Sequence, residues 1–365
     1  MKVVISIDSF KGSLSSVEAG RAAAEGVRRA CPDAVCVVRP LADGGEGTVD
    51  ALAAGLGGEI RTVTVRGPMG RPTVARYALV GDLAVMEMAQ AAGITLVPPD
   101  ERNPLLASTY GVGEMILDAV AQGARRFVVG IGGSATNDAG RGMLEALGLL
   151  DGQTRGTTPL VSFGSGARPR LQKDDLSFQI ACDVANPLCG PNGASAVFGP
   201  QKGATPEMVA ELDARLRAFA AAHGDPGVTP GDGAAGGLGY AFRVFLGATL
   251  MPGVDLILAT TKLEDEIADA DVVVTGEGRL DGQTVMGKAP IGVARLAKRH
   301  DKPVIAFSGC VGDGVEAVNA AGIDAFFPIL RRVSTLDEVL ETKTAAANLT
   351  ATAEQVFRLF FLRKG

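Results

Sequence analysis

The sequence of 365 residues predicts an α/β protein built on a doubly wound parallel sheet. Apolar strand patterns alternate with helices at both ends of the chain, which is typical of parallel strands buried on both faces. The middle of the chain contains short alternating strands joined by glycine turns, which indicate antiparallel hairpins. We therefore expect a flavodoxin-like domain formed by residues 1–58 and 261–365, with a second α+β domain of residues 59–260 inserted into it.

The two ends of the chain supply the parallel sheet. Near the N-terminus, Val3–Ile7 and Val35–Arg39 are apolar and rich in β-branched residues, so we expect strands there. Near the C-terminus, similar strand patterns recur between helical segments. The expected C-terminal strands are Ala270–Thr275, Pro303–Phe307 and Ala325–Ile329, and the expected helices are Ser16–Ala30, one after Gly47, Ile291–His300, Val315–Ala321 and Ala345–Phe361.

The middle of the chain has a different pattern. Arg61–Val65 and Thr73–Val80 alternate around a turn at Gly67–Gly70, and Leu83–Met88 follows a second turn, so we expect antiparallel pairing. Residues 149–175 are polar and irregular. The other expected elements are helices at Tyr110–Ala121, Ala139–Leu147 and Pro206–Ala222 and strands at Arg126–Gly130 and Phe178–Cys182.

The composition excludes several classes of function. A net charge of −6, with scattered Lys and Arg, argues against a nucleic acid or a membrane surface as partner. The first residues form a strand pattern rather than an export signal, and the five cysteines lack metal-ligand spacing, so we expect a cytoplasmic protein with reduced thiols. Only two histidines are present, His223 and His300, which argues against zinc sites and Ser-His-Asp triads. Acid–base and metal chemistry must therefore come from carboxylates.

Polar loops follow the expected strands, at the sheet edge where doubly wound folds bind ligands. After the first strand we expect Lys11 to open a helix, so that its charge adds to that of the helix N-terminus in binding a phosphate or carboxylate. The alternative is a serine N-cap with a solvated lysine. After the second strand, Asp43 and Glu46 lie among glycines, which suits Mg²⁺ or a sugar-acid hydroxyl. The alternative there is an acidic turn that caps the next helix.

Two loops of the middle segment also carry candidate residues. The glycine spacing of Gly130–Ala135 imitates a dinucleotide fingerprint, but no acidic residue ends a second strand about 20 positions later. A phosphate nest, with hydroxyls from Ser134 and Thr136, fits better. Asp183 ends another expected strand and Asn186 follows it, so Asp183 is a candidate base or metal ligand. An Asx-turn is an equally common reason for this pattern.

The last candidate loop follows Ala270–Thr275. Glu277, Arg279 and Asp281 lie there in an acidic, glycine-rich stretch typical of a cation and phosphate site. Gly282–Lys288 is not a P-loop, because the next residue is alanine and the Mg²⁺-binding hydroxyl is missing. Taken together, the loops indicate phosphoryl transfer, which depends on positioning and charge neutralisation.

Several stretches, in order along nearly the whole chain, resemble the type I glycerate kinase family. They are DSFKGSLS (8–15), PLADGGEGT (40–48), GIGGSATNDAG (130–140), ACDVANPLCGPNGASAVFGPQKGAT (181–205), ATLMPGVDLIL (248–258) and TGEGRLDGQTVMGK (275–288). The resemblance implies an ATP- and Mg²⁺-dependent kinase of D-glycerate that usually forms 2-phosphoglycerate. The chain departs from the family at Ala139, where a second glycine is common, and in residues 149–175, which look short and divergent.

We expect ATP and glycerate to meet in a cleft between the two lobes. Lys11 is expected to neutralise charge on the phosphoryl group or the carboxylate, Asp183 or else Asp43 to accept the hydroxyl proton, and Glu277 with Asp281 to bind Mg²⁺. The predicted substrate- or nucleotide-binding residues are Ser9, Ser13, Gly44, Gly45, Glu46, Gly132, Gly133, Ser134, Thr136, Asn137, Asp138, Asn186, Gly276, Gly278, Arg279 and Lys288.

Two other functions remain open at this point. One is an NAD(P)-dependent oxidoreductase of a small hydroxy acid that would use the Gly130–Ala135 loop. The other is a two-lobed module that binds small acids without catalysis. A homodimer also remains open.

Overall fold

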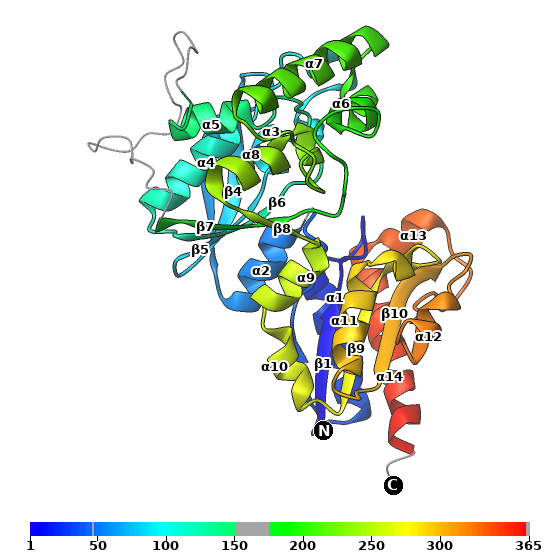
Figure 1. Cartoon of the computed structure of the whole chain (residues 1–365). Helices are drawn as coiled ribbons and strands as arrows, with labels where there is room; N and C mark the ends of the chain where they lie inside the picture. Colours follow the sequence, from blue (N-terminus) through cyan, green and yellow to red (C-terminus); the bar gives the residue numbers. More distant parts are fainter. Residues whose placement is uncertain (46, 151–174, 363–365) are drawn as a thin grey trace. The chain divides into compact units, whose positions relative to one another are not determined.

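The computed structural model describes residues 1–45, 47–150 and 175–362, which form two compact units (Figure 1). The first unit contains residues 1–43, 54–57 and the chain from 257 onwards, and the second contains residues 44–53 and 58–256. The domain limits expected from the sequence stay a prediction. Glu46 and most of the irregular segment expected at 149–175 lie outside the described residues.

The first unit is built on a parallel sheet in the order β11-β10-β9-β1-β2. Counted along this unit alone, the order is 2-1-3-4-5, which is the flavodoxin-like arrangement. The predicted α/β class is therefore confirmed. The strands are β1 (Lys2–Ile7), β2 (Val35–Val38), β9 (Val272–Leu280), β10 (Val304–Val311) and β11 (Ala325–Pro328). The helices are α1 (Ser16–Ala30), α10 (Leu263–Ala268), η6 (Thr284–Met286), α11 (Ala289–Lys298), α12 (Ala317–Ala320), α13 (Leu336–Leu340) and α14 (Thr342–Leu362).

Helices cover both faces of this sheet. Val3, Ile5 and Ile7 of β1 lie in one core with α1 and α14, to which Phe357 of α14 contributes a fully buried ring. Helix α11 packs against β9 on the other face (Figure 1). Strands buried in this way need continuous apolar runs, which is why the end segments could be predicted as parallel strands.

The second unit contains a mixed sheet in the order β3-β4-β5-β6-β7-β8. The first three strands pair antiparallel and the last four pair parallel. These strands are β3 (Glu59–Arg66), β4 (Pro72–Val80), β5 (Leu83–Glu87), β6 (Arg126–Gly130), β7 (Ser177–Ala181) and β8 (Thr249–Met251). The α-helices are α3 (Ala89–Ala92), α4 (Tyr110–Ala121), α5 (Arg141–Leu147), α6 (Ala194–Phe198), α7 (Pro206–Ala222) and α8 (Leu238–Leu246), and 3-10 turns occupy Ile94–Leu96, Pro99–Glu101, Pro200–Lys202 and η5 (Ala234–Gly236). Two further helices, α2 (Thr48–Leu56) and α9 (Gly253–Thr260), have residues in both units.

Aromatic packing holds the parallel half of this sheet to α8. The rings of Phe127 on β6 and Phe178 on β7 stack at 4.6 Å between centroids, and Phe242 of α8 lies 5.8 Å from Phe178. All three rings belong to the main core of the unit. This packing fixes the first residues of β6 and β7, two strands that are each followed by a predicted binding loop.

Three local predictions are wrong. Helix α1 begins at Ser16, where Ser15 and Glu18 form a capping box, so Lys11 does not open a helix. Helix α5 begins at Arg141 rather than Ala139, because Ala139 and Gly140 both have positive φ. The segment 276–280 was expected as a loop but continues β9, pairing with β10 as far as Leu280↔Val311.

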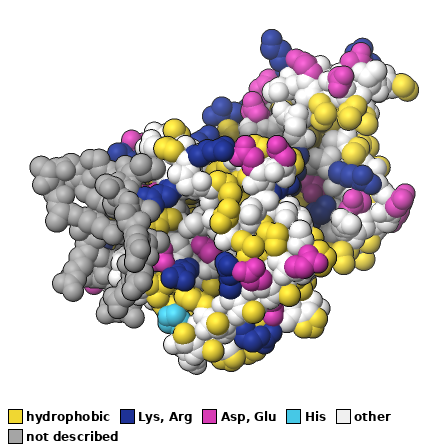
Figure 2. Space-filling view, turned by 90° about the horizontal axis from the view of Figure 1, so that it is seen from above, with side chains coloured by type: hydrophobic (Ala, Val, Ile, Leu, Met, Phe, Trp, Pro, Cys, Tyr) yellow, Lys and Arg dark blue, Asp and Glu magenta, His cyan; other side chains and the backbone are white. Residues whose placement is uncertain are grey.

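Among the described residues, no helix combines the length and hydropathy needed to cross a bilayer. On the face shown in Figure 2, Lys and Arg side chains lie interspersed with Asp and Glu side chains.

Candidate active site

The carboxyl edge of the first unit's sheet brings three carboxylates together. Asp8 follows β1, Asp43 follows β2, and Glu277 lies in the last part of β9. Burial raises the pKa of Asp8 to about 7, and the negative charges of Asp43 and Glu277 contribute to this rise, whereas the Ser9 N–H, which donates to Asp8 Oδ1 at 2.7 Å, and Lys11 oppose it. A carboxyl group with a pKa near 7 can take up a proton at neutral pH. The structure therefore adds Asp8 to Asp43, predicted as a catalytic residue, and to Glu277, predicted as a metal ligand.

Lys11 lies in a tight turn, Phe10–Leu14, instead of a helix. Backbone hydrogen bonds of 2.8 and 3.0 Å close this turn, Gly12 has a φ of +76°, and the Lys11 side chain is exposed. A Cβ on Gly278 would lie 3.4 Å from the Lys11 nitrogen, so the turn packs closely on β9. The Ser13 hydroxyl is buried with no hydrogen-bond partner in the described part of the chain. The arrangement matches the alternative of a serine N-cap with an exposed lysine, close to the carboxylates.

Glu277 is part of a polar group at the end of β9. Its Oε1 accepts a hydrogen bond from Thr284 Oγ1 at 2.7 Å. Lys288 Nζ lies 3.5 Å from Glu277 Oε2 and 3.8 Å from Asp281 Oδ1, and Arg279 Nε lies 3.3 Å from Asp281 Oδ2. Burial raises the pKa of Glu277, while Thr284 and Lys288 act in the opposite direction. The predicted Mg²⁺ ligands, Glu277 and Asp281, are thus close together and share Lys288.

These carboxylates have the chemistry to hold a hard cation. Mg²⁺ binds oxygen ligands and in kinases usually takes one or two carboxylates together with water and phosphate oxygens. The repulsion that contributes to the raised pKa of Asp8 is what a divalent cation would relieve. No group of three acidic, His or Cys side chains among residues 1–45, 47–150 and 175–362 is arranged to hold a metal by itself. A Mg²⁺ ion at this edge would therefore take one or two carboxylates, with water and phosphate oxygens as its other ligands.

In the second unit, the loop after β6 combines an exposed backbone with buried polar side chains. Gly132 and Gly133 are exposed, and Gly133 has a φ of +72° that favours glycine. Thr136 and Asn137 are 0% and 3% exposed. Asn137 Nδ2 donates to Ser195 Oγ at 2.8 Å, whereas Thr136 Oγ1 and Asn137 Oδ1 have no partner among the described residues. Buried polar atoms without partners are rare and need a reason.

Asp138 is engaged inside the protein. Its carboxylate accepts hydrogen bonds from the backbone N–H and the hydroxyl of Thr109 at 2.9 and 2.8 Å and from the N–H groups of Gly140 and Gly142 at 3.1 and 3.2 Å. Burial raises its pKa and these four donors counteract the rise. Such a carboxylate ties the start of α5 to the residue before α4 and orients the loop.

Asp183 and Gly44 both lie against Gly253, the first residue of α9. Asp183 Oδ1 accepts a hydrogen bond from Gly253 N at 2.9 Å, and its side chain is exposed. A Cβ on Gly44 would lie 2.6 Å from the Ala181 side chain, and one on Gly130 would lie 2.2 Å from Gly44 O. Gly45 O accepts a hydrogen bond from the hydroxyl of Thr48, the first residue of α2, at 2.8 Å. Glycine at 44 and at 130 is therefore required by close backbone packing.

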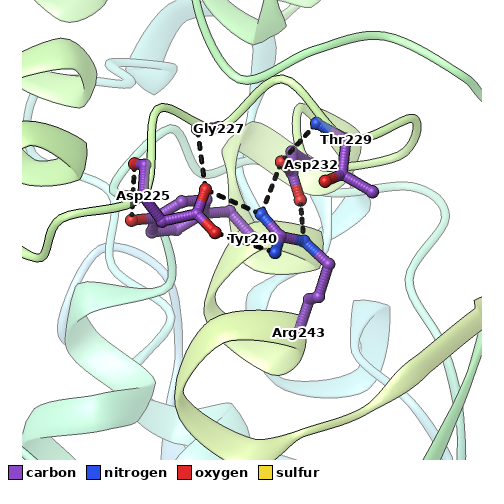
Figure 3. Close-up of polar contacts among 6 residues, drawn as sticks. All are labelled: Asp225, Gly227, Thr229, Asp232, Tyr240 and Arg243. Atoms are coloured by element: carbon purple, nitrogen blue, oxygen red, sulfur yellow. Dashed lines mark hydrogen bonds and ion pairs between the residues drawn. The ribbon is translucent and has the colours of Figure 1, made fainter.

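An arginine clamp supports the loop that carries Asn186 (Figure 3). Arg243 of α8 donates two hydrogen bonds to Asp225 and two to Asp232, at 2.7 to 2.9 Å. Asp232 is 0% exposed and also accepts from Thr229 N at 2.9 Å. The clamped loop in turn donates the N–H of Gly233 to Asn186 O at 2.9 Å. Arg243 and its two carboxylates thus support the predicted binding loop that carries Asn186.

Gly236, which follows the clamped loop in the chain, contacts the loop after β6 directly. Gly236 O accepts the N–H of Ala139 at 3.0 Å, and a Cβ on Gly236 would lie 2.0 Å from Thr136 O. Gly236 has a φ of +68°. Only glycine avoids both the clash and the unfavourable backbone conformation.

We therefore expect Gly236→Ala to lower the free energy of unfolding by about 3 kcal/mol, through strain and the clash with Thr136. The matched control is Gly224→Ala, because Gly224 has a similar φ of +72° but a Cβ added there would meet nothing within 4 Å. Urea denaturation of both variants measures the difference. Equal losses in the two variants would show that close packing at Gly236 contributes nothing.

Two functional candidates were missed by the sequence analysis. Asp8 had a usable signal, since it directly follows the first expected strand and begins the stretch DSFKGSLS. Lys202 lies within the family stretch 181–205, but a single lysine in a polar stretch is normally solvated, so its burial was not predicted. In the structure Lys202 is 2% exposed, and its Nζ donates to Ser134 Oγ at 2.8 Å and to Thr136 O at 2.7 Å.

Carboxylates at the edge of a flavodoxin-like sheet and a glycine loop after a parallel strand are typical of an α/β enzyme that handles phosphate groups. The comparisons with known proteins agree with this class. A sequence model of the Glycerate kinase family matches residues 3–361. A glycerate kinase of Halalkalibacterium halodurans is 46% identical over 356 residues, covering 93% of each chain, and a glycerate 2-kinase of Escherichia coli is 46% identical over 355 residues, also covering 93% of each. A crystal structure assigned to glycerate kinase 2 of Salmonella typhimurium superimposes with a TM-score of 0.87 at 41% identity, covering 100% of this chain and 99% of that one.

The chain belongs to the glycerate kinase family. The resemblance seen in the sequence and the predicted kinase class are confirmed. The oxidoreductase and the non-catalytic binding module find no support in these comparisons.

Proposed function

We propose that this protein transfers the γ-phosphoryl group of ATP to a hydroxyl of D-glycerate, forming 2-phosphoglycerate and ADP. The Escherichia coli relative, a glycerate 2-kinase, supports the choice of substrate and hydroxyl. The cluster of Asp8, Asp43 and Glu277 at the carboxyl edge of the sheet is the observation that carries the chemistry. Mg²⁺ held by Glu277 and Asp281, the ligands predicted from the sequence, would neutralise charge on the phosphates, and this is its part in the proposal.

Asp8 is the general base that the geometry favours. It directly follows β1, its pKa is raised to about 7, and a base poised near the working pH transfers protons most effectively. In its charged form it can accept the proton of the attacking hydroxyl. Asp183 and Asp43, the bases predicted from the sequence, stay proposals that the same substitution test covers.

The other predicted residues have positioning roles in this proposal. Lys11 is exposed beside the carboxylates and can neutralise charge on the phosphoryl group or the glycerate carboxylate. Arg279, with a side chain 62% exposed, can bind a carboxylate through its planar guanidinium. The exposed backbone of Gly132 and Gly133 can donate hydrogen bonds to an anion.

A coupled assay of ADP release tests the proposed function. We expect ADP to form with ATP, Mg²⁺ and D-glycerate, and much more slowly with L-glycerate or with glycerol, which lacks the carboxylate. Phosphorus NMR of the product reports whether the 2- or the 3-hydroxyl has reacted. Removal of Mg²⁺ with EDTA should abolish the reaction. ADP release that does not depend on D-glycerate would contradict the proposal.

The location and assembly of the protein are proposals of the same kind. A cytoplasmic protein, acting on small molecules without nucleic-acid or membrane partners, fits the composition of the chain. A homodimer stays a prediction that light scattering can test.

A further inference from the structure

Lys202 is a buried cation beneath the predicted anion-binding loop. It ends the 3-10 turn Pro200–Lys202, and only 2% of its surface is exposed. No ion pair to Lys202 is found within the described ranges. Its ammonium group instead donates to two uncharged oxygens, Ser134 Oγ and Thr136 O, at 2.8 and 2.7 Å. A buried charge without a direct counter-charge is costly, so the fold must gain something from it.

The hydrogen-bond directions show where that charge can act. An ammonium group only donates, so Ser134 Oγ accepts from Lys202 and its own proton must point elsewhere. Hydrogen bonds in a chain polarise one another, which makes the Ser134 hydroxyl a stronger donor. In the same way, the bond to Thr136 O polarises the peptide that carries the Asn137 N–H.

The neighbouring atoms are consistent with a ligand at this loop. Gly132 and Gly133 are exposed directly before Ser134, and a Cβ on Gly132 would meet nothing within 4 Å. Thr136 Oγ1 and Asn137 Oδ1 are buried without a partner among the described residues. The loop therefore offers an accessible backbone, unused polar atoms and a positive charge behind them.

We propose that Lys202 is the buried counter-charge for an oxyanion that binds at the Gly132–Asn137 loop and accepts a hydrogen bond from the Ser134 hydroxyl. The oxyanion is either the carboxylate of glycerate or a phosphate of the nucleotide, so the inference deepens the proposed function and rests on it. Lys202 acts through Ser134 and the Thr136 peptide and is a positioning residue rather than a catalytic one.

The test measures the binding of D-glycerate, sulfate and ADP by isothermal titration calorimetry. Lys202→Met removes the charge. We expect it to weaken binding of the oxyanion that occupies the loop by about 10- to 100-fold, the usual contribution of a hydrogen bond to a charged group. A loss of affinity for D-glycerate alone would identify the bound oxyanion as the glycerate carboxylate. A loss of affinity for ADP and sulfate would identify it as a phosphate of the nucleotide. Lys343→Met, which removes an exposed lysine of α14, is the matched control and should change none of the three.

A purely structural role is separated by two further measurements. The melting temperature of Lys202→Met should stay near that of the wild type, because replacing an unpaired buried charge by an apolar group is often neutral. In a double-mutant cycle with Ser134→Ala, the losses of affinity should be less than additive, since Lys202 acts partly through Ser134. Unchanged affinity for all three ligands, or fully additive losses, overturns the inference.

Lys202→Gln is the second variant, because its neutral amide can still donate to Ser134; wild-type affinity in this variant also overturns the inference. A third measurement leaves Lys202 in place and uses the Asp8→Asn variant, because the pKa of Asp8 also lies at about 7 and its titration would overlap with that of Lys202. Burial lowers the pKa of Lys202 to about 7, so its charge is lost as the pH rises and sulfate or D-glycerate should bind about tenfold more weakly at pH 8 than at pH 6. The neighbouring charge that acts on Lys202 is Asp138, which favours the ammonium form. Affinity that is constant between pH 6 and 8 counts against the inference.

The inference and the proposed function fail in different ways. A wild-type protein that binds D-glycerate or ADP but releases no ADP in the coupled assay lacks the proposed function. If the wild-type protein is active and both Lys202 variants bind every ligand with wild-type affinity, the counter-charge inference is wrong while the proposed function stands.

Discussion

Asp8→Asn is expected to lower kcat by about 10²- to 10⁴-fold, with a smaller change in KM, because an amide cannot accept the proton of the attacking hydroxyl. In the wild type, kcat should fall as the pH drops, because burial raises the folded-state pKa of Asp8 and the base becomes protonated. The acid limb of the pH–rate profile should be absent in the variant. Steady-state kinetics with ATP and D-glycerate between pH 5.5 and pH 9 checks both expectations.

Stability distinguishes loss of the base from loss of the fold. A carboxyl whose pKa is raised on folding favours the folded state at low pH and opposes it once the pH rises through the folded-state value. Asp8→Asn should therefore raise the melting temperature at pH 8, while activity falls. The matched substitutions Asp43→Asn and Asp183→Asn test the bases predicted from the sequence. If Asp183→Asn caused the large loss of kcat and Asp8→Asn did not, the base would be assigned to Asp183 instead.

Arg243→Ala is expected to lower the free energy of unfolding by about 3 kcal/mol, because it leaves the fully buried Asp232 without its counter-charge. Arg243 also holds Asp225, so the loop before η5 loses both of its charged anchors (Figure 3). Since Gly233 of this loop donates to Asn186 O, we also expect weaker binding of the ligand that contacts Asn186. Urea denaturation and calorimetric binding measure the two effects.

Arg217→Ala is the matched control for the clamp. Arg217 forms an ion pair with Asp213 at 2.8 Å on the surface of α7, and its side chain is 63% exposed. Exposed pairs of this kind contribute less than about 1 kcal/mol. A loss of stability in Arg243→Ala no greater than in this control would mean that the clamp does not stabilise the loop. Arg243→Lys should recover only part of the stability, because lysine cannot reproduce the paired contacts to two carboxylates.

The sequence by itself determined the class of the fold and most of its elements. The helices at Tyr110–Ala121 and Pro206–Ala222 and the strand at Arg126–Gly130 have the bounds predicted for them. Local patterns suffice here, because the spacing of apolar residues and the caps and turns are properties of short stretches. The same holds for the family, whose motifs are contiguous and were confirmed by the comparisons.

Only the tertiary structure decided which polar side chains are buried and which have a shifted pKa. Lys202 and Ser134 are 68 residues apart, Asn137 and Ser195 are 58 apart, and Asp183 and Gly253 are 70 apart. Burial, the charge of neighbours and hydrogen-bond direction depend on such long-range contacts, and no local pattern encodes them. The extension of β9 through Glu277 likewise needed its partner β10, because Gly276 fits against Phe307 only without a Cβ. A sequence can therefore name the loops that carry chemistry, but the pKa of Asp8 and the buried charge of Lys202 arise only when the chain packs.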